Sequence, residues 1–142
     1  MALKNYTTAI EVNKTVGEIQ EMLAAHGAQC IMIEYNTEKR ANRIKFILET
    51  PAGPQGVILP ADPERTLSVL KRENIAEKYK SVEQAERVSW RILKDWLAAQ
   101  LALLETEMVT VDRILLPYFC DHAGITVYEK YNEGLLPIEG GN

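Results

Sequence analysis

Residues 81–104 read SVEQAERVSWRILKDWLAAQLALL, and this run predicts one long helix at the centre of the molecule. Ser81 and Gln84 form a capping box, because a serine at this position accepts a hydrogen bond from the backbone N–H three residues on. The helix is expected to run from the capping box to about residue 105. Both tryptophans of the chain, Trp90 and Trp96, lie within it.

Apolar residues fall on two sides of this helix when each residue advances by about 100°. One side is made of Ala85, Val88, Ile92, Trp96, Ala99 and Leu103. The other side is made of Trp90, Leu93, Leu97, Leu101 and Leu104. A surface helix of a monomer has one apolar stripe, so a helix with two must be covered twice. We expect the chain's own sheet on one side, and a further helix layer or a second subunit, hence a homo-oligomer, on the other.

The residues before the long helix predict a small sheet. Strands are expected at residues 6–12, 30–35, 43–49 and 56–59, where β-branched and alternating apolar residues are bounded by turn residues. Helices are expected at residues 15–26, with a capping box from Thr15 to Glu18, and at 63–73 after an Asp62 cap. A short helix is expected from Thr110 to Leu116, and residues 125–131 suit a strand or a helix.

This order predicts an α+β fold, in which a small, mainly antiparallel sheet (β-α-β-β-β) packs against the long central helix and short C-terminal helices. The 142 residues fit a single domain. Residues 1–60 are expected to hold the sheet with the first helix, and residues 61–117 a helical layer. Residues 118–142 are expected to be a C-terminal extension with a frayed tail from Gly134.

Charge and cysteine content narrow the function classes. The formal net charge is −4, and residues 101–142 hold seven acidic and two basic residues. A dedicated duplex-DNA binder is usually basic throughout, so that class is disfavoured. Two cysteines form no disulfide framework, which favours a reducing compartment. No run of about 18 apolar residues or signal peptide is found, so we expect a cytoplasmic protein without a membrane partner.

A basic edge lies between the two apolar sides of the long helix and contains Arg87, Arg91 and Lys94. Arginine forks match phosphate oxygens, so these residues are candidate ligands for an anionic partner. Trp90 sits beside this edge, where it would stack on a base. The alternative is a solvated edge with an ion pair between Arg91 and Asp95, four residues apart.

A second candidate surface is the outer face of the sheet. Arg43 and Lys45 alternate with Ile44 and Phe46, so both basic side chains point to the face opposite the core. Such a face is able to follow a nucleic-acid backbone. The alternative is a solvated face whose charges protect the sheet from pairing with other strands.

Motifs for catalysis are missing from the sequence. Cys120-Asp121-His122 places three potential metal ligands side by side, but a structural zinc site needs four, usually in spaced pairs. Neither a glycine-rich phosphate loop nor a zincin motif occurs. We therefore expect no catalytic residues, no metal and no cofactor, and a protein that is not an enzyme.

The run from Gln84 to Leu103, which contains RVSWRILKDW and AQLAL, resembles a signature of small, mostly uncharacterised proteins encoded by phages and prophages. Residues 14–20, 26–28 and 116–118 resemble further parts of the same pattern. The resemblance covers most of the chain and lends no activity. It implies a viral accessory protein that acts in the cytoplasm of the bacterial host.

These observations predict a non-enzymatic phage accessory protein that binds an anionic partner, either a nucleotide signal or a nucleic acid, at the basic edge. Countering host defence by sequestration is its expected role, by analogy. One alternative is a single-stranded DNA-binding or annealing protein of phage replication or recombination. Another is an inhibitor that binds a host protein through an apolar helix face and the acidic C-terminal part.

Overall fold

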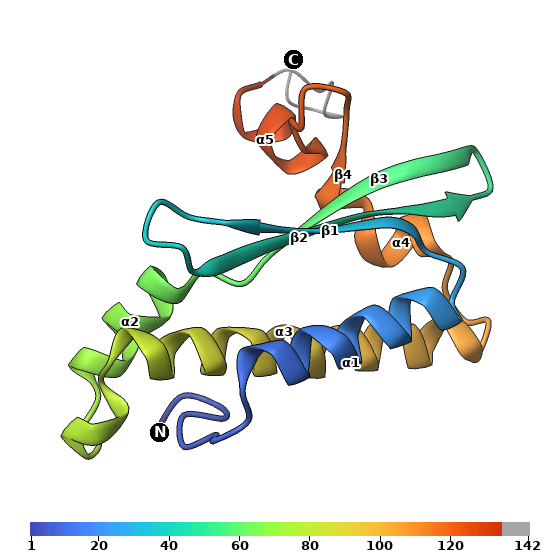
Figure 1. The fold of residues 1–142 in the computed structure, drawn as a ribbon. Helices are drawn as coiled ribbons and strands as arrows, with labels where there is room; N and C mark the ends of the chain where they lie inside the picture. Colours follow the sequence, from blue (N-terminus) through green and yellow to red (C-terminus); the bar gives the residue numbers. More distant parts are fainter. Residues whose placement is uncertain (135–142) are drawn as a thin grey trace.

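A computed structural model describes residues 1–134, and the expected frayed tail lies outside these residues except for Gly134 (Figure 1). In chain order the elements are α1 (Val12–Ala25), β1 (Gln29–Tyr35), β2 (Ala41–Thr50), β3 (Gly53–Pro60), α2 (Pro63–Arg72), the short 3₁₀ helix η1 (Glu77–Tyr79), α3 (Val82–Glu105), α4 (Val111–Leu115), the 3₁₀ helix η2 (Leu116–Tyr118), β4 (Phe119–Cys120) and α5 (Val127–Asn132). The expected α+β class is confirmed. Within the described residues, no helix has the length and apolarity that a membrane span requires.

The sheet is antiparallel with the strand order β1-β2-β3-β4. In the β2–β3 hairpin Ile44 lies opposite Leu59 and Phe46 opposite Val57, and all four side chains are buried. Because neighbouring residues of a strand point to opposite faces, these residues form the apolar inner face of the sheet. The alternation predicted for residues 43–49, which lie in β2, is therefore confirmed.

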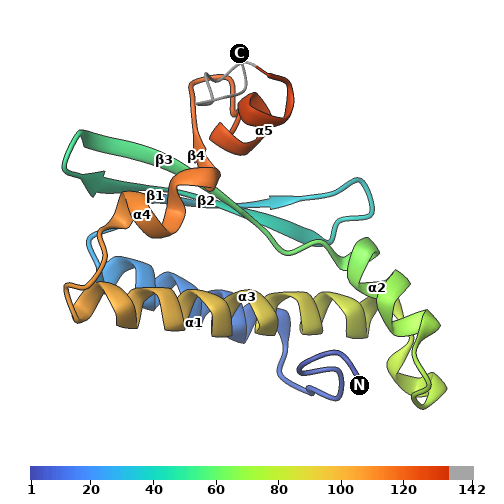
Figure 2. The same ribbon diagram turned by 180° about the vertical axis from the view of Figure 1, so that it is seen from behind.

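Helices cover the inner face, as Figures 1 and 2 show from opposite sides. α1 and α3 lie side by side beneath the sheet, and α2 packs against α3. The segment that contains α5 lies on the outer face, where a Cβ placed on Gly124 would lie 4.0 Å from Ile58 Cδ1 and where Ile58 lines a cavity with Thr126 and Tyr128. The nearness of this segment explains why Ile58 is buried although it points away from the core.

The strand predicted at residues 6–12 does not form, which corrects the expected β-α-β-β-β order. Residues 4–7 make a turn, and Asn5 has a left-handed φ of 65°. The carbonyl oxygens of Tyr6 and Thr8 accept hydrogen bonds from the Gln84 side chain at 2.8 and 2.9 Å. These residues are thus held by α3 rather than by a neighbouring strand. The fourth strand of the sheet is the short β4 instead.

Two helix starts follow their predicted caps and one does not. Ser81 accepts from the backbone N–H of Gln84, but the Gln84 side chain bonds to residues 6 and 8 rather than completing the predicted capping box. Asp62 accepts from the first N–H groups of α2. Thr15 does not cap α1, because this helix already begins at Val12 and the Thr15 side chain is fully buried. Residues 125–131, left open between strand and helix, contain most of α5, which Thr126 caps.

The two apolar sides of α3 are covered to different extents. On the sheet side Trp90, Leu93, Leu97 and Leu101 are all buried, and Trp90 Nε1 donates to the backbone oxygen of Ala41 at 3.0 Å. On the other side Ala85 and Val88 are fully buried, Ile92 and Trp96 are half-buried, and Ala99 and Leu103 are exposed. The second apolar side is therefore covered only along the first half of the helix.

Candidate functional site

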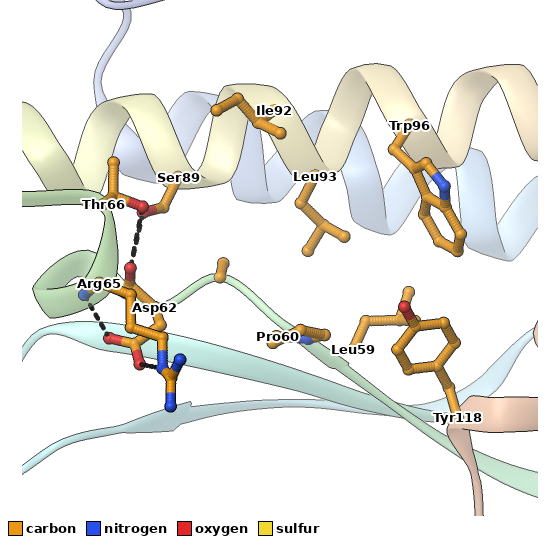
Figure 3. A pocket seen from close by; sticks show the side chains of 11 residues that line it. Leu59, Pro60, Asp62, Arg65, Thr66, Ser89, Ile92, Leu93, Trp96 and Tyr118 are labelled. Atoms are coloured by element: carbon orange, nitrogen blue, oxygen red, sulfur yellow. Dashed lines mark hydrogen bonds and ion pairs between the residues drawn. The ribbon is translucent and has the colours of Figure 1, made fainter. Parts of the chain in front are cut away.

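A cleft opens where the second apolar side of α3 loses its cover. It has a volume of about 340 Å³ and lies between α3, the end of β3 and the start of α2 (Figure 3). Its lining residues are Leu59, Pro60, Ala61, Asp62, Arg65, Thr66, Ser89, Ile92, Leu93, Trp96 and Tyr118. Ligand pockets are usually mostly apolar with a few polar groups that fix orientation, and this cleft has that character.

Two aromatic rings form one end of the cleft. The Trp96 and Tyr118 rings lie edge to face, with their centroids 5.8 Å apart and their planes at 72°. Trp96 comes from α3 and Tyr118 from η2, so the pair joins two segments far apart in the sequence. Both rings are half-buried, which leaves part of each surface free to contact a ligand.

Two hydroxyl groups form the opposite end of the cleft. The Thr66 and Ser89 oxygens lie 2.6 Å apart, and each is within 3.1 Å of the Asp62 backbone oxygen. Two hydroxyl hydrogens thus serve three oxygen–oxygen contacts, so the hydroxyl oxygens keep lone pairs that are able to accept hydrogen bonds from a ligand.

Arg65 and the Asp62 carboxylate lie at the mouth of the cleft. Asp62 Oδ1 accepts from the backbone N–H groups of Glu64 and Arg65, which holds the carboxylate at the start of α2. The Arg65 Nε is 3.8 Å from Asp62 Oδ2, and the Arg65 side chain is 91% exposed. A pair this long and exposed is weak, so the Arg65 guanidinium is available to an anion.

The predicted basic edge of α3 binds other parts of the same chain. Arg91 Nη1 donates to Glu18 at 2.9 Å and to Thr15 at 3.3 Å, and its side chain is only 14% exposed. Arg87 donates twice to Gln84 Oε1, at 3.1 and 2.8 Å. Gln84 in turn holds the backbone of residues 6 and 8. Arg91 therefore links α3 to α1, and Arg87 holds the Gln84 side chain that links α3 to the N-terminal residues.

Trp90 and Asp95 also differ from expectation. Trp90 is fully buried, so the predicted stacking of a base on this ring is wrong. The predicted Arg91–Asp95 pair does not form, because Asp95 accepts from Asn5 at 2.9 Å and lies 3.4 Å from Lys4. The Asn5 hydrogen bond is the main cause that holds the pKa of Asp95 below its ordinary value, and Lys4 acts in the same direction. Lys94 remains half-buried beside Asp95.

Arg43 and Lys45 lie on the outer sheet face, as the alternation predicts. Arg43 pairs with Glu34 on the neighbouring strand. Lys45 lies between Met32 of β1 and Ile58 of β3 in the register of the sheet. Arg43 also lines a second cavity of about 410 Å³, which shares Pro60 and Tyr118 with the first and is bounded by α5 residues such as Tyr128.

Two observations bear on the metal-ligating and thiol side chains of the described residues. Among residues 1–134, no three His, Cys, Asp or Glu side chains gather around one point. Burial raises the pKa of the Cys120 thiol, which disfavours the reactive thiolate. The polar residues of the cleft were not predicted as site residues. Ser89 had a signal, because it shares with Gln100 the polar edge opposite the basic edge of the long helix. Tyr118, in contrast, entered only through the resemblance of residues 116–118, which gave it no role.

Comparison of the chain with protein-family models, with curated proteins and with solved structures gave no match. The resemblance to phage and prophage proteins therefore stays a prediction, and the function is inferred from the cleft itself.

Proposed function

We propose that this protein is a non-enzymatic binding protein for a nucleotide-like anion, with the base in the cleft and the phosphate at its mouth. One observation carries the proposal: the Trp96–Tyr118 pair ends an apolar cleft that opens beside the exposed Arg65 guanidinium. The kind of partner expected from the sequence is kept, but the site moves from the basic edge to the other side of α3.

The chemistry of the cleft suits the parts of a nucleotide. Stacking of a base on an aromatic side chain contributes about 1–3 kcal/mol, and Trp96 and Tyr118 offer two such surfaces. The Thr66 and Ser89 oxygens and the Asp62 carboxylate are acceptors for sugar hydroxyls or base N–H groups. Arg65 supplies the planar fork that matches a phosphate.

A binder of this kind acts by holding its ligand. If the resemblance to phage proteins is right, sequestration of a nucleotide signal in the host cytoplasm is the corresponding role. The exposed Ala99 and Leu103, which continue the apolar side beyond the cleft, favour a second candidate function, inhibition of a host protein through this helix face. Single-stranded DNA binding is distinguished from both by tight binding to oligonucleotides with strong salt dependence.

Intrinsic fluorescence provides the first test, because the chain has two tryptophans and only Trp96 lines the cleft. We expect adenosine monophosphate, a cyclic dinucleotide or a short oligonucleotide to quench the emission. Trp96→Phe should abolish the quenching while the Trp90 emission remains. Quenching that survives in Trp96→Phe, or no binding of any of the three probes by calorimetry, contradicts the proposal.

Arg65→Gln tests the phosphate position. Arg72→Gln is its control, because Arg72 is an exposed arginine in the same helix. Loss of a hydrogen bond to a charged group costs about 1.5–3 kcal/mol, so the Kd for the phosphorylated probe should rise roughly 10- to 100-fold. The Kd for the nucleoside without phosphate should not change, nor should either Kd change in Arg72→Gln. Equal effects of the two variants would show that Arg65 contributes only general charge.

A variant of the basic edge separates the two possible sites. Arg87 lines a different cavity, of about 400 Å³, with Arg40 and Tyr35. If Arg87→Gln abolishes nucleotide binding in a folded protein while Arg65→Gln does not, the ligand binds at the edge rather than in the cleft.

A further inference from the structure

The outer edge of β1 is free. β1 lies at one side of the sheet, and no other segment of residues 1–134 pairs with its outer edge. The opposite edge of the sheet is formed by β4, which is only two residues long. There the chain folds back, and Cys120 pairs with Thr126 through an isolated bridge. Alternate N–H and C=O groups of a seven-residue strand thus point away from the sheet.

The side chains in the middle of β1 give this part of the edge little protection against pairing. Natural edge strands avoid pairing through lysine, proline, bulges or a covering segment. β1 reads QCIMIEY, and its one charged residue, Glu34, is paired with Arg43. Irregular pairing at both ends of the strand protects those ends, so only the regular part, Met32 to Glu34, is open to pairing. Met32 is 53% exposed on the outer face.

α1 lies under β1, and its flank away from α3 carries no charge. Figures 1 and 2 show α1 and β1 on the same side of the molecule. With Ile19 pointing to the core and Glu18 toward Arg91, helical geometry assigns the free flank to Gly17, Gln20 and Ala24, whereas Val16 packs against the core. A Cβ at Gly17 would meet no atom within 4 Å, so the flank has open space for a neighbour.

We propose that a second copy of this chain docks on this side, with the two β1 edges paired antiparallel and the two α1 flanks in contact across a two-fold axis. The outward backbone groups of β1 are able to pair with an extended strand, and a second β1 is such a strand. A two-fold axis places each surface against itself, and an uncharged surface meets no like charge there. The regular part of β1 spans only Met32 to Glu34, so α1, about 21 Å long, would supply most of the contact.

This dimer is independent of the proposed nucleotide site. The cleft lies against the side of α3 that faces α2, whereas α1 packs on a different side of α3. Nucleotide binding and self-association are therefore expected to respond to different substitutions.

Light scattering after size exclusion tests the interface. The wild-type chain should have a mass of twice 16.0 kDa and dissociate on dilution. Ala24→Glu and Met32→Glu, which place carboxylates against their symmetry copies, should each shift the mass toward the monomer. Ala25→Glu is the matched control, because Ala25 is also exposed but points about 100° away from Ala24, and it should leave the dimer intact.

A wild-type monomer at the highest soluble concentration would overturn the proposal, and so would a dimer that resists both Ala24→Glu and Met32→Glu. Hydrogen exchange gives a second readout, since the outward amides of β1 should exchange more slowly as protein concentration rises. Slow exchange of these amides in a monomer at all concentrations would assign the edge to another part of the same chain and contradict pairing between copies.

Discussion

The two tryptophans of α3 have the same side chain and lie six residues apart, yet their surroundings differ. Trp90 is fully buried between α3 and the sheet, and its indole N–H is bonded to Ala41. Trp96 is half-buried at the end of a cleft, against Tyr118. The side of the helix that the chain covers completely is part of the core, whereas the side that it covers halfway leaves apolar surface exposed. Apolar periodicity alone does not separate the two.

Truncation of the two tryptophans should have unequal effects on stability. Trp90→Ala removes a fully buried aromatic side chain and leaves the Ala41 oxygen without its donor, so we expect a loss of about 3–5 kcal/mol. Trp96→Ala should cost about half as much, because part of the ring is already in water. Urea unfolding followed by circular dichroism measures both. Equal losses would show that the Trp96 side is as well packed as the Trp90 side.

Gln84→Ala tests whether the edge of α3 that faces the N-terminal residues belongs to the covered part of the molecule. The variant removes both hydrogen bonds to residues 6 and 8 and the acceptor of Arg87. We expect a loss of roughly 1–3 kcal/mol in the free energy of unfolding. Gln100→Ala, in the same helix, should change it by less than about 0.5 kcal/mol. If limited proteolysis cuts near residue 6 no faster in Gln84→Ala, the N-terminal residues are held by other contacts.

Arg91→Met sharpens the comparison further, because it tests whether a cation of the predicted ligand site is structural. Its pair with Glu18 is mostly buried on the Arg91 side, so the loss should be roughly 1–2 kcal/mol. A double-mutant cycle with Glu18→Gln should show that most of this loss is shared between the two residues. Lys94→Met serves as the control and should be nearly neutral. Additive single effects would mean that Arg91 acts without Glu18.

Asp95 gives the smallest expected effect, a pH dependence. Its pKa is lowered in the folded protein by Asn5 and Lys4, so its contribution to stability is complete above the unfolded-state pKa of about 3.9. The contribution is lost as pH falls through the lower folded-state pKa. Wild-type stability should therefore decline more steeply below about pH 5 than that of Asp95→Asn. Parallel pH profiles of the two proteins would show that Asp95 is not coupled to the N-terminal residues.

The elements that sequence reasoning predicted well are those with local signals. The caps Ser81 and Asp62 and the alternation of Ile44 and Phe46 depend on neighbours within a few residues, and the structure places them as expected. The strand at residues 6–12 was wrong because its backbone oxygens bond to Gln84, 76 and 78 residues away. No local pattern carries that information.

The candidate site shows the same limit. The sequence shows which residues lie four positions apart on the basic edge, but it does not show which residues of other segments pair with it. The edge was therefore predicted to be available to a ligand. Arg91 meets Glu18 across 73 residues, and Asp95 meets Asn5 across 90. The cleft depends on where α2 stops covering α3 and where Tyr118 returns to Trp96, which only the folded chain determines.

The hydrogen bonds that join the first residues to α3 also order events during synthesis. Asn5 finds its partner only when Asp95 exists, after about two thirds of the chain has been made. Until then the N-terminal residues have no stable place, and the Arg91 contact that holds α1 is missing as well. Contacts this distant in sequence slow folding, because a long loop must close before they form. The growing chain should therefore expose α1 to chaperones and proteases until residues 91–100, which contain Arg91 and Asp95, have been translated.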